Sequence, residues 1–352
     1  RIENAQATSK GMRWYEMEPE RVPLGTKRMP KKQVYHFLLG DPGMCSYSDK
    51  VIKQLEPENI KTMKDWNKKF TSPITDDEII TLLRLSTVID ELWESQIQLR
   101  KEVNAKTQDS LSIFGYTDDA VDSHTTIRQK DKIFSELYKT EHMKNAGPYA
   151  RLKFAMDYWC ALWFWPIDKA DLLPTRSEFL FDMSLILEGT TKSVLVTDVT
   201  TDKKNIHGQI SMFPTEMQKI ESEILDLYSG IGEVDIPVLK KQNPRLDLVA
   251  QIAKQNKFMH WELEFADLFA EHGGFDLMIG NPPWIRLEWN EQNLLSDLNP
   301  MFAVKNLTAN QTIKHREGAL NNSSSCYAYF SEYESISGEQ SFLNAFVNYP
   351  HL

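Results

Sequence analysis

The four residues Asn281, Pro282, Pro283 and Trp284 are the part of the sequence best suited to chemistry. The side-chain amide oxygen of Asn281 and the backbone carbonyl oxygen of Pro282 both accept hydrogen bonds, and a rigid two-proline turn can fix both acceptors on one side. The indole of Trp284 offers a flat apolar face on which an aromatic ring can stack. Because two converging acceptors suit an NH₂ group, these residues predict a pocket for an exocyclic amine on a planar ring such as adenine. With its hydrogens held, the amine can direct its nitrogen lone pair toward an electrophilic methyl group.

A short apolar run, FDLMI at 275–279, leads into these four residues. Gly273 and Gly274 precede the run and Gly280 follows it, which is the composition expected of a central strand buried on both faces of a parallel sheet. Open parallel sheets bind their ligands just beyond the carboxyl ends of the strands, where Asn281 would lie. The alternative is a Pro-Pro turn that packs under a tryptophan for stability alone.

Composition and charge narrow the classes of protein to which the chain can belong. Its 352 residues are enough for two domains and a substantial core, and 41% hydrophobic with 26% charged residues are ordinary for a soluble globular protein. A formal net charge of −10 argues against a general nucleic-acid clamp but leaves room for a local basic face. The sequence shows no charged-then-apolar signal at its start and no run near the ~20 apolar residues that span a bilayer, so no membrane partner is expected.

The cysteines and the chain ends support two further expectations. Cys45, Cys160 and Cys326 are far apart and odd in number, which predicts reduced thiols in a cytoplasm rather than a disulfide framework or a zinc site. Because the sequence starts at Arg1 and stops without a polar tail, we expect it to be a piece of a longer protein.

Periodicity and turn residues predict a mainly helical chain before about residue 240. The pattern is helical from Lys50 to Pro166, with one helix that starts at Thr75 and carries the capping-box partner Glu78. The aromatic stretch 150–165 is expected to be a buried helix that Pro166 stops. The other expected elements are strands at 33–39 and 193–199, a turn at 40–43, amphipathic helices at 215–228 and 246–256, and a mobile loop at 301–326.

Several charged residues have two interpretations each, either contact with phosphate groups or plain solvation. These residues are Lys27, Arg28, Lys31 and Lys32 in GTKRMPKK, and Arg286 and Arg316 near the proposed pocket.

A metal site is the weaker interpretation of HWELEF at 260–265. On a strand, alternation would place His260, Glu262 and Glu264 on one face. Metal-binding histidines usually come with a second histidine or cysteine at tight spacing, so an ordinary strand edge is favoured and no metal is predicted. His272, just before GGFD, is expected to lie in a loop.

NPPW at 281–284, after the expected apolar strand, resembles motif IV of S-adenosylmethionine-dependent amino-methyltransferases, whose pattern is Asn/Asp/Ser-Pro-Pro-aromatic, and upstream the segment HWELEFADLFAEHGGFDLMIGNPPW extends the match. With VYHFLLGDPGMCSYSDKVIKQL and FLNAFVNYP, the chain is similar to the large N6-adenine DNA methyltransferases of Type IIG restriction–modification and related phage-defence systems. The specific motif covers only about residues 259–289. The resemblance implies that Asp267, fourteen residues before Asn281, contacts the adenine part of the cofactor.

The same resemblance implies the partners and the roles of the motif residues. The cofactor would be S-adenosylmethionine, and the substrate would be double-stranded DNA with one adenine flipped out of the stack. Asn281 and Pro282 would hold the amine of that adenine, Pro283 would shape the turn, and Trp284 would stack on the base.

One feature of these methyltransferases is missing from the sequence. They carry a glycine-rich loop, Asp-Pro-x-x-Gly-x-Gly, that approaches the methionine part of the cofactor. GDPGMCSYS at 40–48 has Asp41 and Pro42, but Cys45, Ser46 and Tyr47 stand where close backbone approach demands glycine. We therefore interpret this stretch as a turn and expect the glycine-rich loop to lie upstream in the parent polypeptide.

The sequence thus predicts an α+β fold that is predominantly helical and ends in a portion of a class I, Rossmann-like methyltransferase sheet. Its expected parts are a helical insertion or scaffold region at 1–240, a partial methyltransferase domain at 241–300, and a flexible loop with the start of a further segment at 301–352. The predicted parent function is site-specific adenine-N6 methylation of DNA. The alternatives are methylation of glutamine or RNA, and a non-catalytic helical scaffold that binds DNA or a partner.

Overall fold

The structure is a computed structural model of the chain, and it describes residues 22, 24, 28–30, 32–107, 126–138, 141–189, 234–281, 288–305, 307–345 and 348. Most residues of this part of the chain are helical, and it contains no strand. The prediction of a predominantly helical chain is confirmed, whereas the predicted sheet is not observed among the described residues. None of the described helices is long and apolar enough to cross a membrane.

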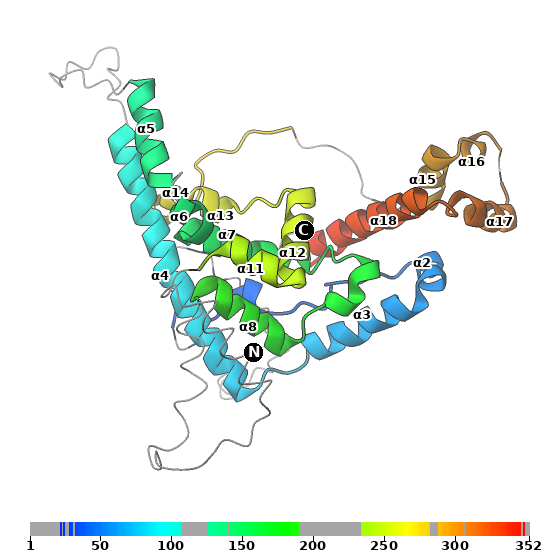
Figure 1. Cartoon of the computed structure of the whole chain (residues 1–352), viewed down its shortest axis with the longest axis horizontal. Helices are drawn as coiled ribbons and strands as arrows, with labels where there is room; N and C mark the ends of the chain where they lie inside the picture. Colours follow the sequence, from blue (N-terminus) through cyan, green and yellow to red (C-terminus); the bar gives the residue numbers. More distant parts are fainter. Residues whose placement is uncertain are drawn as a thin grey trace, which may run out of the picture.

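The helices follow one another in the order shown in Figure 1. Their bounds are η2 His36–Leu38, α2 Lys50–Leu55, α3 Pro57–Phe70, α4 Asp76–Thr107, α5 Ile127–Tyr138, α6 Glu141–Ala146, α7 Pro148–Ala161, η3 Ile167–Leu172, α8 Arg176–Leu187, α11 Ile236–Gln242, α12 Pro244–Asn256, α13 Trp261–Glu264, α14 Ala266–His272, α15 Glu291–Leu298, α16 Met301–Val304, α17 Ala309–Ala319 and α18 Ser323–Leu343.

Helix α7 lies at the centre of the core. Every side chain from Phe154 to Ala161 is buried, so the helix has no solvent face along this stretch. It contacts α4, α6, α8, α12, α13 and η2. The prediction of a buried helix in the 150–165 stretch is confirmed, although the helix ends at Ala161, before Pro166.

The turn predicted at 40–43 is confirmed, and it closes the C-terminal end of α7. The Met44 N–H donates to Asp41 O at 3.1 Å, and Gly43 is required because a Cβ there would lie 2.7 Å from the Trp163 ring. After the turn, Cys45 Sγ donates to Leu162 O at 3.1 Å, and Tyr47 Oη donates to Trp165 O at 2.7 Å. These two side chains satisfy backbone carbonyl groups of the segment 162–165 that follows α7.

The strand predicted at 33–39 is wrong, because this segment forms the 3₁₀ helix η2 and extended backbone on either side of it. Its apolar residues pack on helices and not in a sheet: Phe37 and Leu38 are buried, and Leu39 O accepts a hydrogen bond from Trp159 Nε1 at 2.8 Å. The Trp159 side chain therefore donates the hydrogen bond that the backbone of a neighbouring strand would donate in a sheet.

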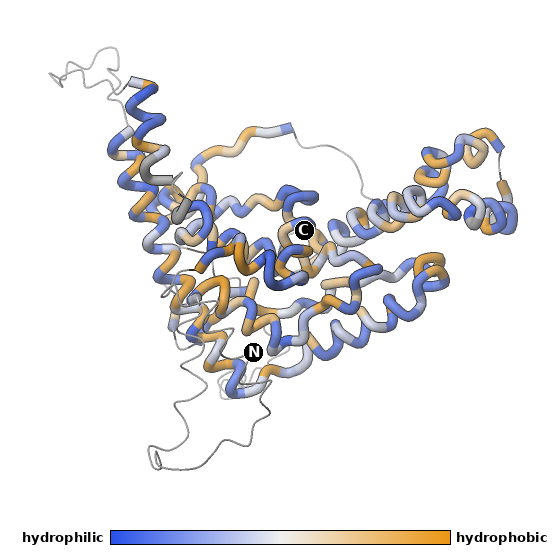
Figure 2. The backbone as a smooth tube through the Cα atoms, in the orientation of Figure 1, coloured by the Kyte–Doolittle hydropathy of each residue, from blue (hydrophilic) through white to orange (hydrophobic). Residues whose placement is uncertain are grey.

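The predicted start of α4 is confirmed. Thr75 N–H donates to the Glu78 carboxylate at 2.8 Å and Glu78 N–H donates to Thr75 Oγ1 at 3.4 Å, which is the reciprocal pattern of a capping box. Leu82, Leu85, Ile89 and Trp93 form the buried face of this helix. Figure 2 shows hydrophobic and hydrophilic residues alternating along α4, as expected of a helix with one face in the core.

Two further predictions concern the second half of the chain. The helix predicted at 246–256 is confirmed as part of α12, whereas the elements predicted at 193–199 and 215–228 lie outside the described residues. The irregular loop predicted at 301–326 is wrong, because α16, α17 and the start of α18 occupy that range. Thr308 caps α17 through Gln311, and Asn322 caps α18 by accepting from Ser324 N–H at 3.1 Å, so the Asn- and Thr-rich composition marks helix starts.

A substitution at Gly338 tests how closely α18 packs against the segment that follows α7. A Cβ on Gly338 would lie 2.7 Å from Phe164 Cδ1 and 2.8 Å from the backbone oxygen of Trp163. We expect Gly338→Ala to lower the free energy of unfolding by about 1–3 kcal/mol, because backbone cannot move aside as a flexible side chain can. Equilibrium denaturation measures this change.

The matched control is Gly318→Ala in α17, where nothing lies within 4 Å of the new Cβ. This substitution should leave stability unchanged or raise it by up to about 1 kcal/mol, because alanine is the better helix former. Equal effects of the two substitutions would contradict the close contact between α18 and the end of α7.

Candidate functional site

The segment that leads into Asn281 is fixed at its start by a cluster of aromatic rings. Gly273 ends α14 in the left-handed conformation, with φ 75°, and its N–H donates to Phe269 O at 2.9 Å. The chain then turns so that the Phe275 ring meets Trp261, Phe265 and Phe269 edge-on, at centroid distances of 5.9, 5.0 and 5.6 Å. This cluster sets the point from which residues 276–281 leave the helices.

The strand predicted at 275–279 is not formed in this structure. Leu277, Met278 and Ile279 are 74%, 68% and 89% exposed, and the backbone from 275 to 281 has no regular structure. Figure 2 shows the hydrophobic run after α14 as a separate stretch of chain away from the helices. A strand buried on both faces needs hydrogen-bonding neighbours, and the described residues provide none. The expected buried strand is therefore an exposed apolar segment here.

Only the first residue of the predicted amine pocket is described. Asn281 is exposed, and Pro282, Pro283 and Trp284 lie outside the described residues, as does Arg286. On the far side of this interval, the Trp289 ring packs edge-on against Tyr329 and Tyr333 of α18, at 5.5 and 5.0 Å. Aromatic contacts thus fix the chain on both sides of the motif, to α13 and α14 before it and to α18 after it.

Asp267, the predicted cofactor-binding acid, is ionised and held by helix α4. Its carboxylate accepts from Arg100 Nε at 2.5 Å and from Asn104 Nδ2, and its side chain is 15% exposed. Burial by itself raises the pKa of this carboxyl group, but the hydrogen bond and charge of Arg100, together with hydrogen bonds from the backbone N–H groups of Asp267 and Leu268, outweigh burial and hold the pKa below its ordinary value of 3.8. Arg100, Asn104 and the backbone N–H groups of Asp267 and Leu268 together match the roughly four lone-pair sites of this carboxylate, so it is fully held in this structure.

The residues before Asp267 form helix α13, so the strand predicted for HWELEF is wrong. His260 Nε2 lies 2.7 Å from Asp157 Oδ1 of α7, Glu262 accepts from Leu24 N–H at 3.1 Å, and Glu264 accepts from Tyr149 Oη. The three side chains therefore reach three separate partners instead of one ion. Among the described residues no group of three or more potential ligands could hold a metal ion.

A cavity of about 460 Å³ lies beside α13, between α7, the 256–262 segment and α18. The rings of Trp159, Phe258, Trp261, Phe269 and Phe342 line much of it. Such a volume and such a lining suit a planar ligand of small-molecule size. Sequence reasoning assigned the aromatic residues of 150–165 to the core, and no local signal separates a core tryptophan from one that also faces a cavity.

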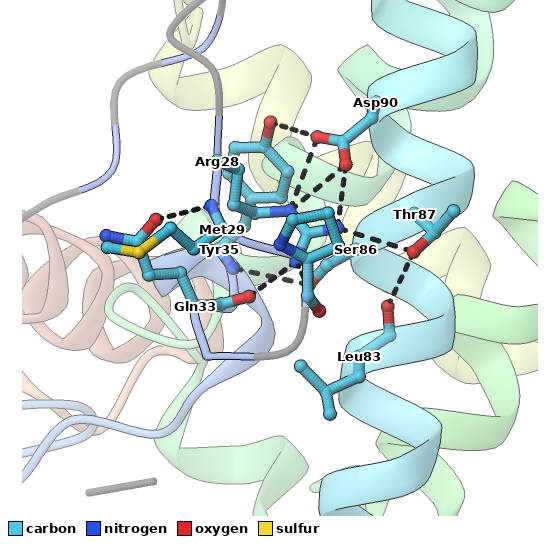
Figure 3. A network of polar contacts seen from close by, with 9 residues as sticks. Arg28, Met29, Gln33, Tyr35, Leu83, Ser86, Thr87 and Asp90 are labelled. Atoms are coloured by element: carbon cyan, nitrogen blue, oxygen red, sulfur yellow. Dashed lines mark hydrogen bonds and ion pairs between the residues drawn. The ribbon is translucent and has the colours of Figure 1, made fainter. Parts of the chain in front are cut away.

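Two of the arginines considered as phosphate contacts form structural ion pairs. Arg28 is buried, with Nη2 at 2.7 Å from Asp90 Oδ2 and Nη1 donating to Gln33 O at 2.6 Å; Tyr35 Oη completes the network by donating to Asp90 at 2.7 Å (Figure 3). Arg316 pairs with Glu291 through Nε at 2.5 Å and Nη2 at 2.8 Å. Neither guanidinium is available to a phosphate group, so both interpretations made from the sequence, phosphate contact and plain solvation, are wrong here.

His272 and the basic residues near Arg28 complete the predicted set. His272 is the exposed last residue of α14, not a loop residue, and Lys32 is exposed. Lys27 and Lys31 lie outside the described residues. Cys45, Cys160 and Cys326 are free thiols, as predicted.

The Arg100–Asp267 pair gives the first test of how the site is held. We expect Arg100→Gln to lower the free energy of unfolding by about 1–3 kcal/mol at neutral pH, because a partly buried carboxylate loses its charged partner. The pKa of Asp267 is depressed in the folded state, so this contribution is present above pH 3.8 and is lost as the pH falls through the folded-state pKa. Denaturation curves of both proteins at several pH values measure the difference.

Lys101→Gln is the matched control, because its pair with Glu271 joins side chains that are 43% and 51% exposed. Such a surface pair contributes at most about 1 kcal/mol. A loss from Arg100→Gln that does not depend on pH, or that only equals the control, would show that Asp267 is not held by charge.

Comparison with known proteins adds an independent finding. The family described as Eco57I restriction-modification methylase matches residues 135–335, more than half of the chain, and this range includes both Asp267 and the Asn281–Trp284 motif. No curated protein and no solved structure matches the chain. The match supports a methyltransferase that acts in restriction–modification, as the resemblance implied. The chain belongs to the Eco57I restriction-modification methylase family.

Proposed function

We propose that this chain carries the amine-binding part of a DNA adenine-N6 methyltransferase that uses S-adenosylmethionine. The observation that carries the proposal is family membership over 135–335, since the matched range contains a sequence suited to holding an exocyclic amine. The N6 amine of adenine lies inside the duplex, so the base must be flipped out before the motif can hold it.

The motif residues act by holding the adenine base and its amine in a fixed orientation. Asn281 Oδ1 and Pro282 O accept the two amine hydrogens, Pro283 fixes the turn, and Trp284 stacks on the base. When bound, S-adenosylmethionine supplies an electrophilic methyl group. The two acceptors orient the amine lone pair toward that group, and they stabilise the positive charge that develops on the nitrogen before a proton leaves it.

Two separate features of the described residues support a place for the adenosine half of the cofactor. Asp267 is an ionised acceptor, which would have to exchange one of its present partners for the cofactor, and the aromatic-lined cavity beside α13, which Asp267 does not line, has room for a planar group. No residue of the 352 provides the glycine-rich loop for the methionine half. We therefore propose that polypeptide outside this sequence supplies that loop.

The exposed segment 275–279 also supports a methyltransferase fold that is completed by further polypeptide. Three adjacent apolar side chains at 68–89% exposure are far from their preferred environment. We propose that this segment becomes a strand when a sheet is present to pair with it. The sequence also predicts a strand at 193–199, which lies outside the described residues.

A non-catalytic scaffold is the second candidate function. It is favoured by the engagement of Asp267 with Arg100 and Asn104, which also gives this acid a purely structural role. The absence of the glycine-rich loop from the sequence points the same way. Cofactor binding and methyl transfer distinguish the two candidates.

Asn281→Ala tests the catalytic role of the motif. We expect the rate of methyl transfer to DNA to fall by about 100-fold or more, because one of the two acceptors that orient the amine is lost. Incorporation of a labelled methyl group from S-adenosylmethionine measures the rate. Asn310→Ala, at an exposed position of α17, is the control and should keep the full rate. Equal rates for the two variants would remove Asn281 from the mechanism.

Asp267→Asn tests the cofactor-binding role and separates it from the structural one. We expect this variant to weaken S-adenosylmethionine binding by about tenfold or more, because a charged acceptor is lost. Arg100→Gln keeps the carboxylate, so it should retain binding despite its lower stability. Calorimetric titration measures both variants, on these 352 residues and on the protein extended toward its N-terminus.

Binding by the extended protein alone would support a cofactor site completed by the missing loop. If neither protein binds, or if both variants lose affinity equally, Asp267 serves the structure only and the scaffold candidate replaces the enzyme.

A further inference from the structure

Helices α2 and α3 carry a dense group of lysines on a chain that is acidic as a whole. Residues 50–70 contain six lysines and three carboxylates, while the formal net charge of the chain is −10. All six lysines are exposed, and within the part of the chain that the structure describes none of them forms an ion pair. They are Lys50, Lys53, Lys61, Lys64, Lys68 and Lys69.

Three of these lysines form a stripe along α3, named here the α3 lysine stripe: Lys61, Lys64 and Lys68. Their spacings of three and four residues place them on one side of the helix, turned away from the buried Met63 and Phe70. Seven residues rise about 10 Å along a helix axis, and each strand of duplex DNA carries one charge per about 3.4 Å of its own axis. The stripe is therefore long enough to reach more than one phosphate group of a duplex that lies along it.

Helix stability accounts for only part of this arrangement. Lysines in the last turn interact favourably with the helix dipole, which explains Lys68 and Lys69. Lys61 and Lys64 lie nearer the middle of the helix, where the dipole has little effect. Lysines elsewhere do pair with carboxylates, as in Lys101–Glu271 at 2.9 Å and Lys153–Asp157 at 2.8 Å. The α3 lysines keep their charge unpaired although Glu58 and Asp65 lie on the same helix.

The position of the two helices leaves this charge open to a large partner. Figure 1 shows α2 and α3 along one edge of the molecule, at the right of the view, and Figure 2 shows many hydrophilic residues along α3. The apolar side of α3 is already occupied, since α3 packs on η3 and buries Trp66 and Phe70. After Pro57 the exposed side of α3 has no apolar residue, and its lysines outnumber its two carboxylates, Glu58 and Asp65, which suits a polyanion and not an apolar protein surface.

We propose that the α3 lysine stripe contacts the phosphate backbone of duplex DNA. This inference rests on the proposed function, which makes DNA the substrate. Contacts to phosphates carry no sequence information, so the stripe contributes affinity and orientation while the recognised sequence is read elsewhere.

The experiment replaces Lys61, Lys64 and Lys68 together by glutamine, which removes the charge and keeps a good helix former. The matched control replaces Lys241, Lys254 and Lys314, three exposed lysines on separate helices, so that the net charge changes equally. Fluorescence anisotropy measures the binding of a short duplex by the 352-residue chain between about 50 and 200 mM salt. Circular dichroism confirms that each variant is folded.

We expect the stripe variant to bind the duplex at least about tenfold more weakly than the control, with a salt dependence reduced by about 0.9 for each lost phosphate contact. Identical affinity and salt dependence in the two variants would overturn the proposal, as would a wild-type chain that binds no duplex at low salt. The proposal is also wrong if the stripe variant loses binding to anionic lipid vesicles or to RNA but not to duplex DNA.

Methyl transfer separates this inference from the function on which it rests. If the stripe variant methylates DNA with the wild-type KM, the stripe proposal fails and the proposed function stands. If the wild type transfers no methyl group while its DNA binding still depends on the stripe, the proposed function fails and the DNA-binding surface stands.

Discussion

The structure depends on one helix that is buried on every side. Because all side chains of α7 from Phe154 to Ala161 are inside, the helix cannot exist without the elements packed around it. Apolar burial of this extent is the main stabilising term available to the chain. The polar side chains of this helix then need partners inside the protein, and the surrounding segments provide them.

These partners connect the core to the candidate site. Asp157 of α7 reaches His260, Tyr149 reaches Glu264, and Arg100 of the neighbouring α4 reaches Asp267, so three polar contacts hold α13 and α14 in place. Just after the other end of α7, Cys45 and Tyr47 bond carbonyl groups of the segment 162–165, and α18 packs against the same segment at Gly338. Since α18 also binds Trp289, both sides of the motif depend on the same buried helix.

Local signals in the sequence were sufficient for helices with a clear cap or apolar face, but they missed α13, α16 and α17 and predicted strands that are not formed. The capping box at Thr75, the apolar face of α4 and the aromatic composition of α7 depend on residues close in sequence, and each was predicted. The apolar runs at 33–39 and 275–279 fit a strand equally well in composition, but a strand forms only if another strand lies beside it. The motif located Asp267 and Asn281, whereas Arg100, 167 residues before Asp267, is a partner that no local pattern reveals.

The most direct test of the account is the identity of the group that becomes methylated. Duplex DNA is incubated with S-adenosylmethionine and the protein, in its 352-residue and N-terminally extended forms, and the DNA is then digested and its nucleosides separated by mass spectrometry. We predict N6-methyladenine as the product, formed by wild-type protein and lost with Asn281→Ala. Methylation of RNA or of a glutamine side chain, or a methylated DNA base other than adenine, would contradict the assignment of the amine pocket, and the absence of any product would favour a scaffold.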